Sequence, residues 1–265
     1  MCLILLAWQV HPDYPLVVAA NRDEFFARSS APAGFWPESP DILAGHDLEA
    51  GGTWLGVSRS GRFAALTNYR EGGKQRANAP SRGALVVDFL EARGDAGEDN
   101  TPEPYLARLA KRGNDYNGFN LFVSDGERLG YYSNRGAQPR WLRPGIYGLS
   151  NHLLDTPWPK LASAKAAFAT ALDDLPAQNA FFGLLADQEI FPDIHLPETG
   201  VPLAWERILS AIFVGSPDYG TRASTLLTIR KDGLVTLTER SFGAGSIALG
   251  EVRESFHASV ISTGV

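Results

Sequence analysis

Short runs of apolar residues, separated by turn-forming residues, dominate both ends of the chain. The first 21 residues contain two of them, CLILLAW at residues 2–8 and PLVVAAN at residues 15–21, joined through the turn-like sequence HPDYP. Runs of this length that are rich in bulky and β-branched residues are typical of buried strands. We therefore predict two adjacent, paired strands at the start of the chain.

Three further segments have the pattern of β-hairpins, with an apolar stretch on each side of a residue pair that favours a tight turn. The pairs are Ser60-Gly61, Asp125-Gly126 and Asp232-Gly233. Glycine suits the second position because it adopts backbone angles that other residues disfavour. Each segment predicts two antiparallel strands.

Apolar residues at helical spacing gather instead in the middle of the chain. Residues 81–94 begin with a serine that can cap a helix and end with a glycine, and residues 160–172 are rich in alanine. Two shorter apolar segments, residues 180–187 and 203–214, also predict helices. Strands at both ends and helices between them favour an α+β fold, with antiparallel sheet covered by helices.

Three stretches rich in proline, glycine and charged residues interrupt these patterns, at residues 29–41, 70–80 and 94–104. We predict that they are long surface loops. None has the composition of a linker between domains, so we expect one domain over residues 1–265.

The charge balance narrows the class of partner. The chain has 24 basic and 30 acidic residues, a formal net charge of −6, and 44% hydrophobic residues. This balance offers no electrostatic footprint for nucleic acid or for an anionic membrane surface. The opening apolar run is soon interrupted by His11, Asp13 and Asn21, so we expect no signal peptide and no membrane span.

Cys2 is the only cysteine of the chain. A lone cysteine forms no internal disulfide, and neither CxxC pairs nor His spacings for a metal site are present, which favours a cytoplasmic protein without a metal centre. The glycine pairs lack the lysine and the strand-to-helix context of a phosphate-binding loop, so we expect no cofactor.

The position of Cys2 suggests chemistry. Methionine aminopeptidases remove Met1 when the second side chain is small, and the mature chain would then begin with a residue that carries both a thiol and a free α-amine. The amine can take the proton of the thiol and later return it to a leaving group. Because neither group is fully ready at neutral pH, such a site needs a nearby cation.

Arg22 and Asp23 can supply the neighbouring charges. If the first two strands pair, the end of the second strand lies beside Cys2. Arg22 would then tune the thiol or hold an anionic substrate, and Asp23 would orient the α-amine by a hydrogen bond. Asn68 and Asn151 are strand-end or loop amides suited to stabilising a developing oxyanion, which is worth ~3 kcal/mol for each donor. These residues predict a small-molecule substrate or ligand.

Seven short motifs occur in order over nearly the whole chain. They are Cys2 after Met1, NRDE at 21–24, GGTWLG at 51–56, TNYR at 67–70, GLSN at 148–151, DTPWPK at 155–160 and YGTRAST at 219–225. Together they resemble the Asn-Arg-Asp-Glu family, which is related to the transport and Golgi organization protein 2 of animals. That family is in turn similar to N-terminal nucleophile hydrolases whose mature chains start with cysteine.

The resemblance implies a four-layer αββα sandwich of two antiparallel sheets and an enzyme that hydrolyses a carbon–nitrogen amide bond. It implies Cys2 as the nucleophile and Arg22 and Asp23 as the pair beside it. It also implies Asn68 and Asn151 as oxyanion or substrate-positioning amides, and Arg222 as a further site arginine. In the similar hydrolases the arginine and the aspartate are separated by other residues, whereas here they are adjacent.

Each of these residues also has a structural interpretation. Cys2 would serve as a small buried hydrophobe, Arg22 and Asp23 as an ion pair, the asparagines as turn residues, and Arg222 as a surface charge. The resemblance leaves a second function open as well, a non-catalytic carrier of haem or of lipid or acyl-CoA-like metabolites on the same fold, since relatives are linked to haem and lipid homeostasis. Oligomeric state is not readable from the pattern.

Overall fold

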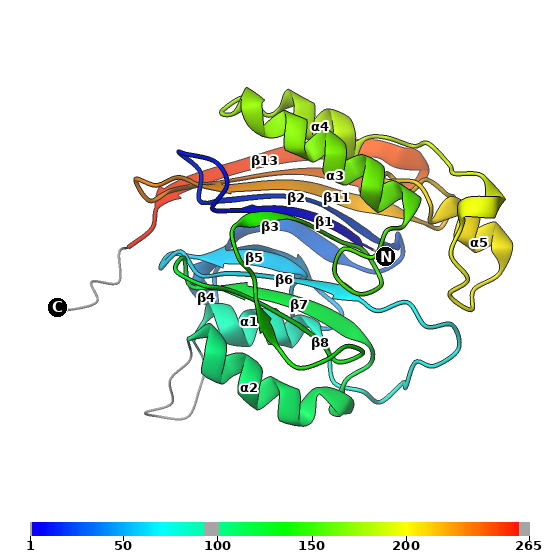
Figure 1. The fold of residues 1–265 in the computed structure, drawn as a ribbon, viewed down its shortest axis with the longest axis horizontal. Coiled ribbons are helices and arrows are strands. Elements are labelled where there is room, and N and C mark those ends of the chain that lie inside the picture. Colours follow the sequence, from blue (N-terminus) through cyan, green and yellow to red (C-terminus); the bar gives the residue numbers. More distant parts are fainter. Residues whose placement is uncertain (1, 93–100, 260–265) are drawn as a thin grey trace.

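The chain folds into two antiparallel sheets that pack face to face and are covered by helices on both outer faces (Figure 1). The structure is a computed structural model that describes residues 2–92 and 101–259. Helices α3 (Pro159–Ala171) and α4 (Asn179–Leu185) lie on the six-stranded sheet, and α1 (Gly83–Leu90) and α2 (Pro102–Arg112) lie on the seven-stranded sheet. The architecture is therefore the α+β, four-layer αββα sandwich that the sequence predicts.

The six-stranded sheet contains, in spatial order, β10 (Gly145–Leu149), β1 (Cys2–Trp8), β2 (Leu16–Phe25), β11 (Tyr219–Ile229), β12 (Leu234–Gly243) and β13 (Ile247–His257). The seven-stranded sheet contains β3 (Ser30–Trp36), β4 (Ser39–Asp47), β5 (Leu55–Ser58), β6 (Phe63–Asn68), β7 (Phe119–Ser124), β8 (Leu129–Ser133) and β9 (Arg140–Trp141). Helix α5 (Leu203–Ile208) lies beyond one end of the six-stranded sheet (Figure 1). The four hairpins predicted from the sequence are β1–β2, β5–β6, β7–β8 and β11–β12.

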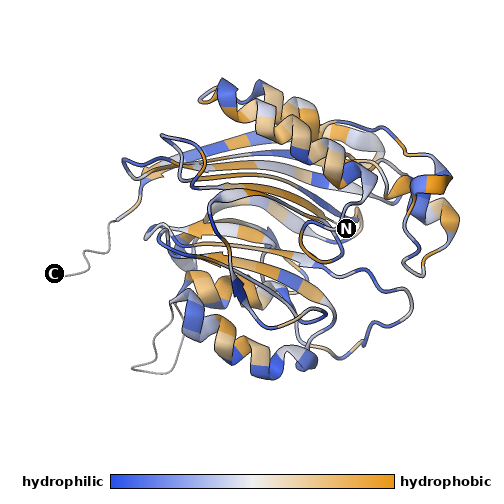
Figure 2. Ribbon diagram, viewed as in Figure 1, coloured by the Kyte–Doolittle hydropathy of each residue, from blue (hydrophilic) through white to orange (hydrophobic). Residues whose placement is uncertain are grey.

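Strand β1 shows why its sequence is apolar throughout rather than alternating. Ile4, Leu6 and Trp8 face the other sheet, whereas Leu3 and Leu5 on the opposite face pack under helices α3 and α4. A strand that is buried on both faces needs apolar residues at every position. Figure 2 shows the result, with hydrophobic strands at the centre and hydrophilic loops around them.

The prediction of a loop over residues 29–41 is wrong, because β3 and the start of β4 occupy this stretch. β3 lies at the edge of its sheet, where a proline such as Pro32 is tolerated and half-buried residues give no clear apolar pattern. Residues 70–80 form a loop, as predicted. Of the third stretch, residues 94–100 lie outside the described residues and residues 102–104 belong to α2.

The helices differ from the prediction in two places. Helix α2 was not predicted; it begins at a proline, which suits the first turn of a helix because that turn needs no backbone donor. The helix predicted over residues 203–214 ends at Ile208. In the segment after it, Ile212 packs with the residues of α3 and α4, whereas Leu209 and Val214 pack near Tyr219. No helix among residues 2–92 and 101–259 combines the length and the apolar character needed to cross a membrane.

Candidate functional site

The pairing of β1 with β2 places Arg22 directly opposite Cys2. Residues that face each other on antiparallel strands point to the same side of the sheet. Both side chains therefore lie on the face that meets the second sheet, at the end of the sandwich. Cys2 is 9% exposed and Arg22 is 6% exposed, so the sequence has brought a thiol and a guanidinium together in a buried position.

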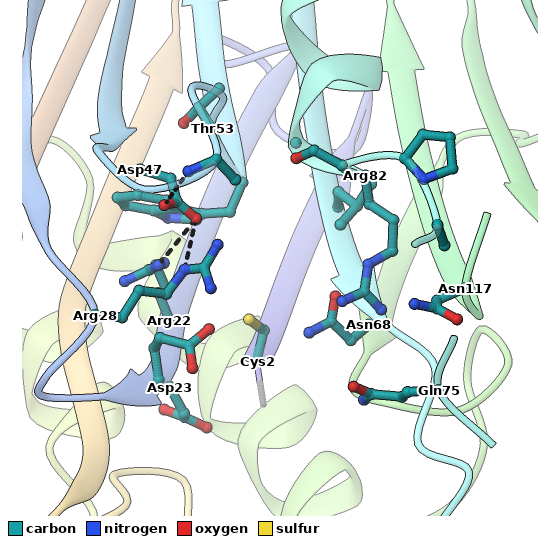
Figure 3. A pocket seen from close by; sticks show the side chains of 18 of the residues that line it. Cys2, Arg22, Asp23, Arg28, Asp47, Thr53, Asn68, Gln75, Arg82 and Asn117 are labelled. Atoms are coloured by element: carbon teal, nitrogen blue, oxygen red, sulfur yellow. Dashed lines mark hydrogen bonds and ion pairs between the residues drawn. The ribbon is translucent and has the colours of Figure 1, made fainter. Parts of the chain in front are cut away.

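Cys2 lies in a cavity of about 590 Å³. Of the residues predicted to form the site, Cys2, Arg22, Asp23 and Asn68 line this cavity, whereas Asn151 and Arg222 do not. Figure 3 shows the thiol between two groups of side chains, with Arg22, Asp23, Arg28 and Asp47 on one side and Asn68, Gln75, Arg82 and Asn117 on the other. The cavity is thus polar and is lined by residues of both sheets.

Burial has the largest effect on the pKa of the Cys2 thiol. It raises the pKa of Cys2 above its ordinary value, and the guanidinium of Arg22 lowers this pKa by less than burial raises it. The sequence suggested that a nearby cation would activate the thiol, but the net shift has the opposite sign. The thiol at position 2 therefore needs a base to take its proton.

Arg22 is held by contacts with the second sheet. Its guanidinium lies over the ring of Trp54, with 4.4 Å between Cζ and the ring centroid, and its Nη2 is 3.8 Å from Oδ2 of Asp47. Asp47 is also bonded by Arg28 at 2.8 Å. The Nη1 atom of Arg22 is buried and has no hydrogen-bond partner among the described residues. The guanidinium of Arg22 thus keeps unused hydrogen-bonding capacity in the interior.

Asp23 follows Arg22 in the strand and therefore points to the other face of the sheet, toward the helices. Its Oδ1 accepts a hydrogen bond of 2.8 Å from the hydroxyl of Thr221. Burial raises the pKa of this carboxyl group. Because β2 ends here, Asp23 still reaches the edge of the cavity, although it lies on the opposite side of the strand from Arg22.

Lys160 lies on the same helix-facing side and was not singled out from the sequence, although it ends the motif DTPWPK. The side chain is 2% exposed, and its Nζ donates hydrogen bonds to the carbonyl oxygens of Leu209 at 2.8 Å and Ala211 at 3.3 Å. Burial lowers the pKa of Lys160 to about 8, and the nearby charge of Asp23 partly opposes this effect. A buried ammonium group therefore lies beneath the site.

Asn151 holds the backbone at position 2 rather than lining the cavity. Its Oδ1 accepts a hydrogen bond of 3.1 Å from the backbone N–H of Cys2, and its Nδ2 donates one of 2.8 Å to the carbonyl oxygen of Asn68. The side chain of Asn68, in contrast, lines the cavity and makes no hydrogen bond within the described part of the chain. The two asparagines that the sequence grouped together are thus placed differently.

Arg222 lies away from Cys2. Its Nη1 donates hydrogen bonds to the carbonyl oxygens of Phe25 at 3.0 Å and Arg28 at 2.8 Å, and its Nη2 donates one of 3.2 Å to the hydroxyl of Ser30. It lines a smaller cavity of about 250 Å³, which adjoins the Cys2 cavity at Arg22 and Trp54. The structure therefore places Arg222 where it holds the loop between β2 and β3.

Sequence reasoning missed Arg28, Asp47, Gln75 and Arg82, which line the same cavity as Cys2. Arg82 is the most informative of them. It precedes helix α1, its Nη1 donates a hydrogen bond of 3.1 Å to the carbonyl oxygen of Gly118, and burial lowers its pKa. No signal in the sequence distinguishes it from a solvated loop arginine. Residues 2–92 and 101–259 hold no cluster of three side chains of His, Cys, Asp or Glu arranged for a metal ion.

Comparison with known proteins relates the chain to others along most of its length. Residues 1–244 match the family model described as Transport and Golgi organisation 2. The Transport and Golgi organization protein 2 homolog of Bos taurus is 42% identical over 264 residues, which covers 91% of this chain and 93% of the relative. The Homo sapiens homolog is 38% identical over 275 residues, with 96% and 97% covered.

Two solved structures are similar at low identity. One is a C2A mutant of the conjugated bile acid hydrolase of Clostridium perfringens, with a TM-score of 0.41, 9% identity and all of both chains covered. The other is a Caenorhabditis elegans ortholog of N-acylethanolamine-hydrolyzing acid amidase, with a TM-score of 0.40, 12% identity and coverage of 85% of this chain and 92% of that one.

Proposed function

This chain belongs to the Transport and Golgi organisation 2 family, and we propose that it is an amide hydrolase whose nucleophile is the thiol of Cys2, with the α-amine freed by removal of Met1. One observation carries the proposal. The thiol of Cys2 lies in a polar cavity, while the backbone nitrogen of the same residue is held by Asn151. Nucleophile and base would then be two atoms of one residue.

In the first half of the reaction the α-amine takes the proton of the Cys2 thiol, and the sulfur attacks the carbonyl carbon of the amide. A C–S bond forms and the carbonyl oxygen becomes an oxyanion. The proton then passes from the amine to the amide nitrogen, the C–N bond breaks, and the free amine product leaves a thioester on Cys2. The raised pKa of the thiol makes the amine necessary, because little thiolate forms on its own.

In the second half the same amine takes a proton from water, and the water oxygen attacks the thioester. The C–S bond breaks, the carboxylic acid leaves, and the sulfur regains the proton. Asn68 is the proposed oxyanion donor, because its side chain lines the cavity and its amide is not used elsewhere among the described residues. Asn151 and Asp23 would orient the amine, Arg22 would stabilise the thiolate, and Arg222 would act as a positioning residue for the loop after β2.

The competing function is a carrier of haem or of an acyl-CoA-like metabolite that binds in the same cavity without reaction. Both proposals place the protein in the cytoplasm. The hydrolase and the carrier differ in the chemical groups that they require at position 2. The hydrolase requires a free α-amine and a thiol there, whereas a carrier requires neither.

Three measurements on the purified full chain test the hydrolase. Intact mass should show that Met1 is absent, an electrophilic thiol probe should label Cys2, and a panel of N-acyl amides should include one that is hydrolysed. Cys2→Ala keeps the small second residue, so processing continues, but it removes the nucleophile. We expect turnover to fall by about a hundredfold or more. Retained Met1, or equal turnover in the variant, would overturn the proposal.

A further inference from the structure

The cavity around Cys2 continues into a second one of about 690 Å³. Five residues line both and so mark the junction; they are Glu24, Arg28, Asn68, Gln75 and Arg82. The two cavities differ in their walls. Charged and amide side chains surround Cys2, whereas aromatic and aliphatic side chains line much of the second cavity. A ligand at the junction would meet two chemically different environments.

Arg82 brings to the junction a positive charge that is not part of an ion pair among the described residues. Arg22 and Arg28 both lie against Asp47, whereas Arg82 has no ion pair with a carboxylate in the described part of the chain and bonds only the carbonyl oxygen of Gly118. Figure 3 shows its guanidinium extending into the cavity, near Asn68 and across from Cys2. The remaining N–H groups can therefore bind an anionic group of a ligand.

Two acidic side chains, Glu24 and Glu71, lie near Arg82 and could compete with an anionic ligand for its guanidinium. Glu24 at the junction accepts at Oε1 a hydrogen bond of 2.9 Å from the backbone N–H of Phe25, and its charge partly opposes the lowering of the pKa of Arg82 by burial. Glu71 in the second cavity is paired with Arg135 at 2.6 Å. Neither forms an ion pair with Arg82.

The second cavity contains a cluster of three aromatic rings. Phe25 lies 5.0 Å from Tyr219 and 6.5 Å from Trp205, and these two rings lie 5.5 Å apart, all measured between centroids. Phe25 is 50% exposed, which is unusual for a large apolar side chain next to a cavity. An apolar group placed against it would be removed from water together with the ring.

We propose, on the basis of the proposed function, that the substrate is an amide with a carboxylate at one end and an apolar group at the other. Arg82 binds the carboxylate, and the aromatic cluster of Phe25, Trp205 and Tyr219 binds the apolar group. The scissile carbonyl lies at the junction, on the side of the first cavity, because Cys2 lines the first cavity and not the second. N-acyl amino acids with a hydrocarbon or aromatic acyl group have this combination, whereas neutral amides and short polar amides do not.

Arg82→Gln tests the carboxylate subsite. With N-octanoylglycine as substrate, we expect the apparent KM of the variant to rise by about tenfold or more, because a charge-assisted hydrogen bond is lost. With uncharged N-octanoylglycinamide, KM should stay within about twofold of the unsubstituted protein. Arg82→Lys, which retains the charge, should recover part of the loss. Arg128→Gln, at an exposed pair with Glu103, is the matched control for net charge.

Phe25→Ala tests the apolar subsite. The unsubstituted protein should prefer N-octanoylglycine over N-acetylglycine, and the variant should lose most of this preference. Ile194→Ala is the control, because Ile194 is 85% exposed and lies outside both cavities. An equal rise of KM for the charged and the neutral substrate in Arg82→Gln, or an unchanged preference in Phe25→Ala, would overturn the assignment.

Binding to the Cys2→Ala protein separates this inference from the proposed function. Calorimetric titration with N-octanoylglycine needs no reaction. If it binds, with the same dependence on Arg82 and Phe25, while the unsubstituted protein hydrolyses no amide, the hydrolase fails and the assignment of the ligand stands. If amides are hydrolysed with no preference for carboxylate or chain length, the hydrolase stands and the assignment fails.

Discussion

The space between the two sheets has two very different ends. At one end Trp8, Leu16 and Phe63 belong to one apolar cluster, each with at most 2% of its surface exposed. At the other end of the same strands, Cys2 and Arg22 face a polar cavity. The register of β1 and β2 is continuous from Trp8 opposite Leu16 to Cys2 opposite Arg22, so one pair of strands builds both ends.

Stability and chemistry are thus separated along one pair of strands. Apolar burial at the first end stabilises the sandwich. The second end opposes folding, because burying the guanidinium of Arg22 there costs free energy even where it is partly paired. Substitutions at the two ends should therefore affect different properties of the protein.

The largest effect on stability is expected from Phe63→Ala. Phe63 is fully buried at the apolar end, so its loss leaves a cavity and should lower the free energy of unfolding by about 3–5 kcal/mol. Urea denaturation of the variant and the unsubstituted protein measures this change. Phe25→Ala removes the same ring from a half-exposed position and should cost less than about 1 kcal/mol. An equal loss of unfolding free energy in Phe63→Ala and Phe25→Ala would contradict the difference between the apolar and the polar end.

Arg22→Met tests whether the polar end contributes to the reactivity of Cys2 rather than to stability. An apolar side chain in place of a buried charge should change the free energy of unfolding by less than about 1 kcal/mol. Since Arg22 lowers the pKa of the Cys2 thiol, its removal should raise that pKa further and slow alkylation at neutral pH. The pH dependence of alkylation measures the shift. A large loss of stability with unchanged alkylation would contradict the prediction.

The smallest effect is expected from Lys160→Met, as a change in the pH dependence of stability. The pKa of Lys160 is about 8 in the folded chain and 10.5 for an ordinary lysine. Between these values the unfolded chain binds more protons, so the unsubstituted protein gains stability as pH rises, by about 1 kcal/mol from pH 8 to pH 9. In the variant this gain should be absent.

Unfolding by urea at pH 8 and pH 9 measures the difference between the two proteins. Lys165→Met is the control on the same helix, because Lys165 is partly exposed and is paired with Asp155. If Lys160→Met shows the same rise in stability as the unsubstituted protein, the buried ammonium is not the group that titrates.

Local pattern was enough to predict much of the fold. The apolar runs of β1 and β2 and the Asp-Gly and Ser-Gly turns are signals that reside in neighbouring residues, and the structure has the corresponding hairpins. The pairing of the first two strands also predicted that Arg22 lies beside Cys2. Edge strand β3 and helix α2 were missed, because their residues alternate poorly or begin with proline.

The segment Asn21–Glu24 shows the limit of what the local sequence pattern predicts about side-chain contacts. Strand geometry dictates that neighbouring side chains point to opposite faces, so Arg22 meets the second sheet and Asp23 meets Thr221. Asn21, on the same face as Asp23, donates hydrogen bonds to the carbonyl oxygens of Leu185 and Ile212 and so fastens the helical layer. The alternation is readable from the sequence, but the partners are not.

The sequence by itself determined the strands, the turns, the pairing of β1 with β2 and the position of the single thiol, because these depend on side-chain pattern over a few residues. Only the tertiary structure decided that Arg82 and Asp47 face Cys2, that Asn151 holds its backbone nitrogen, and that burial outweighs Arg22 at the thiol. These features depend on side chains that are remote in the chain and on the exclusion of water between two packed sheets, and no local pattern encodes either.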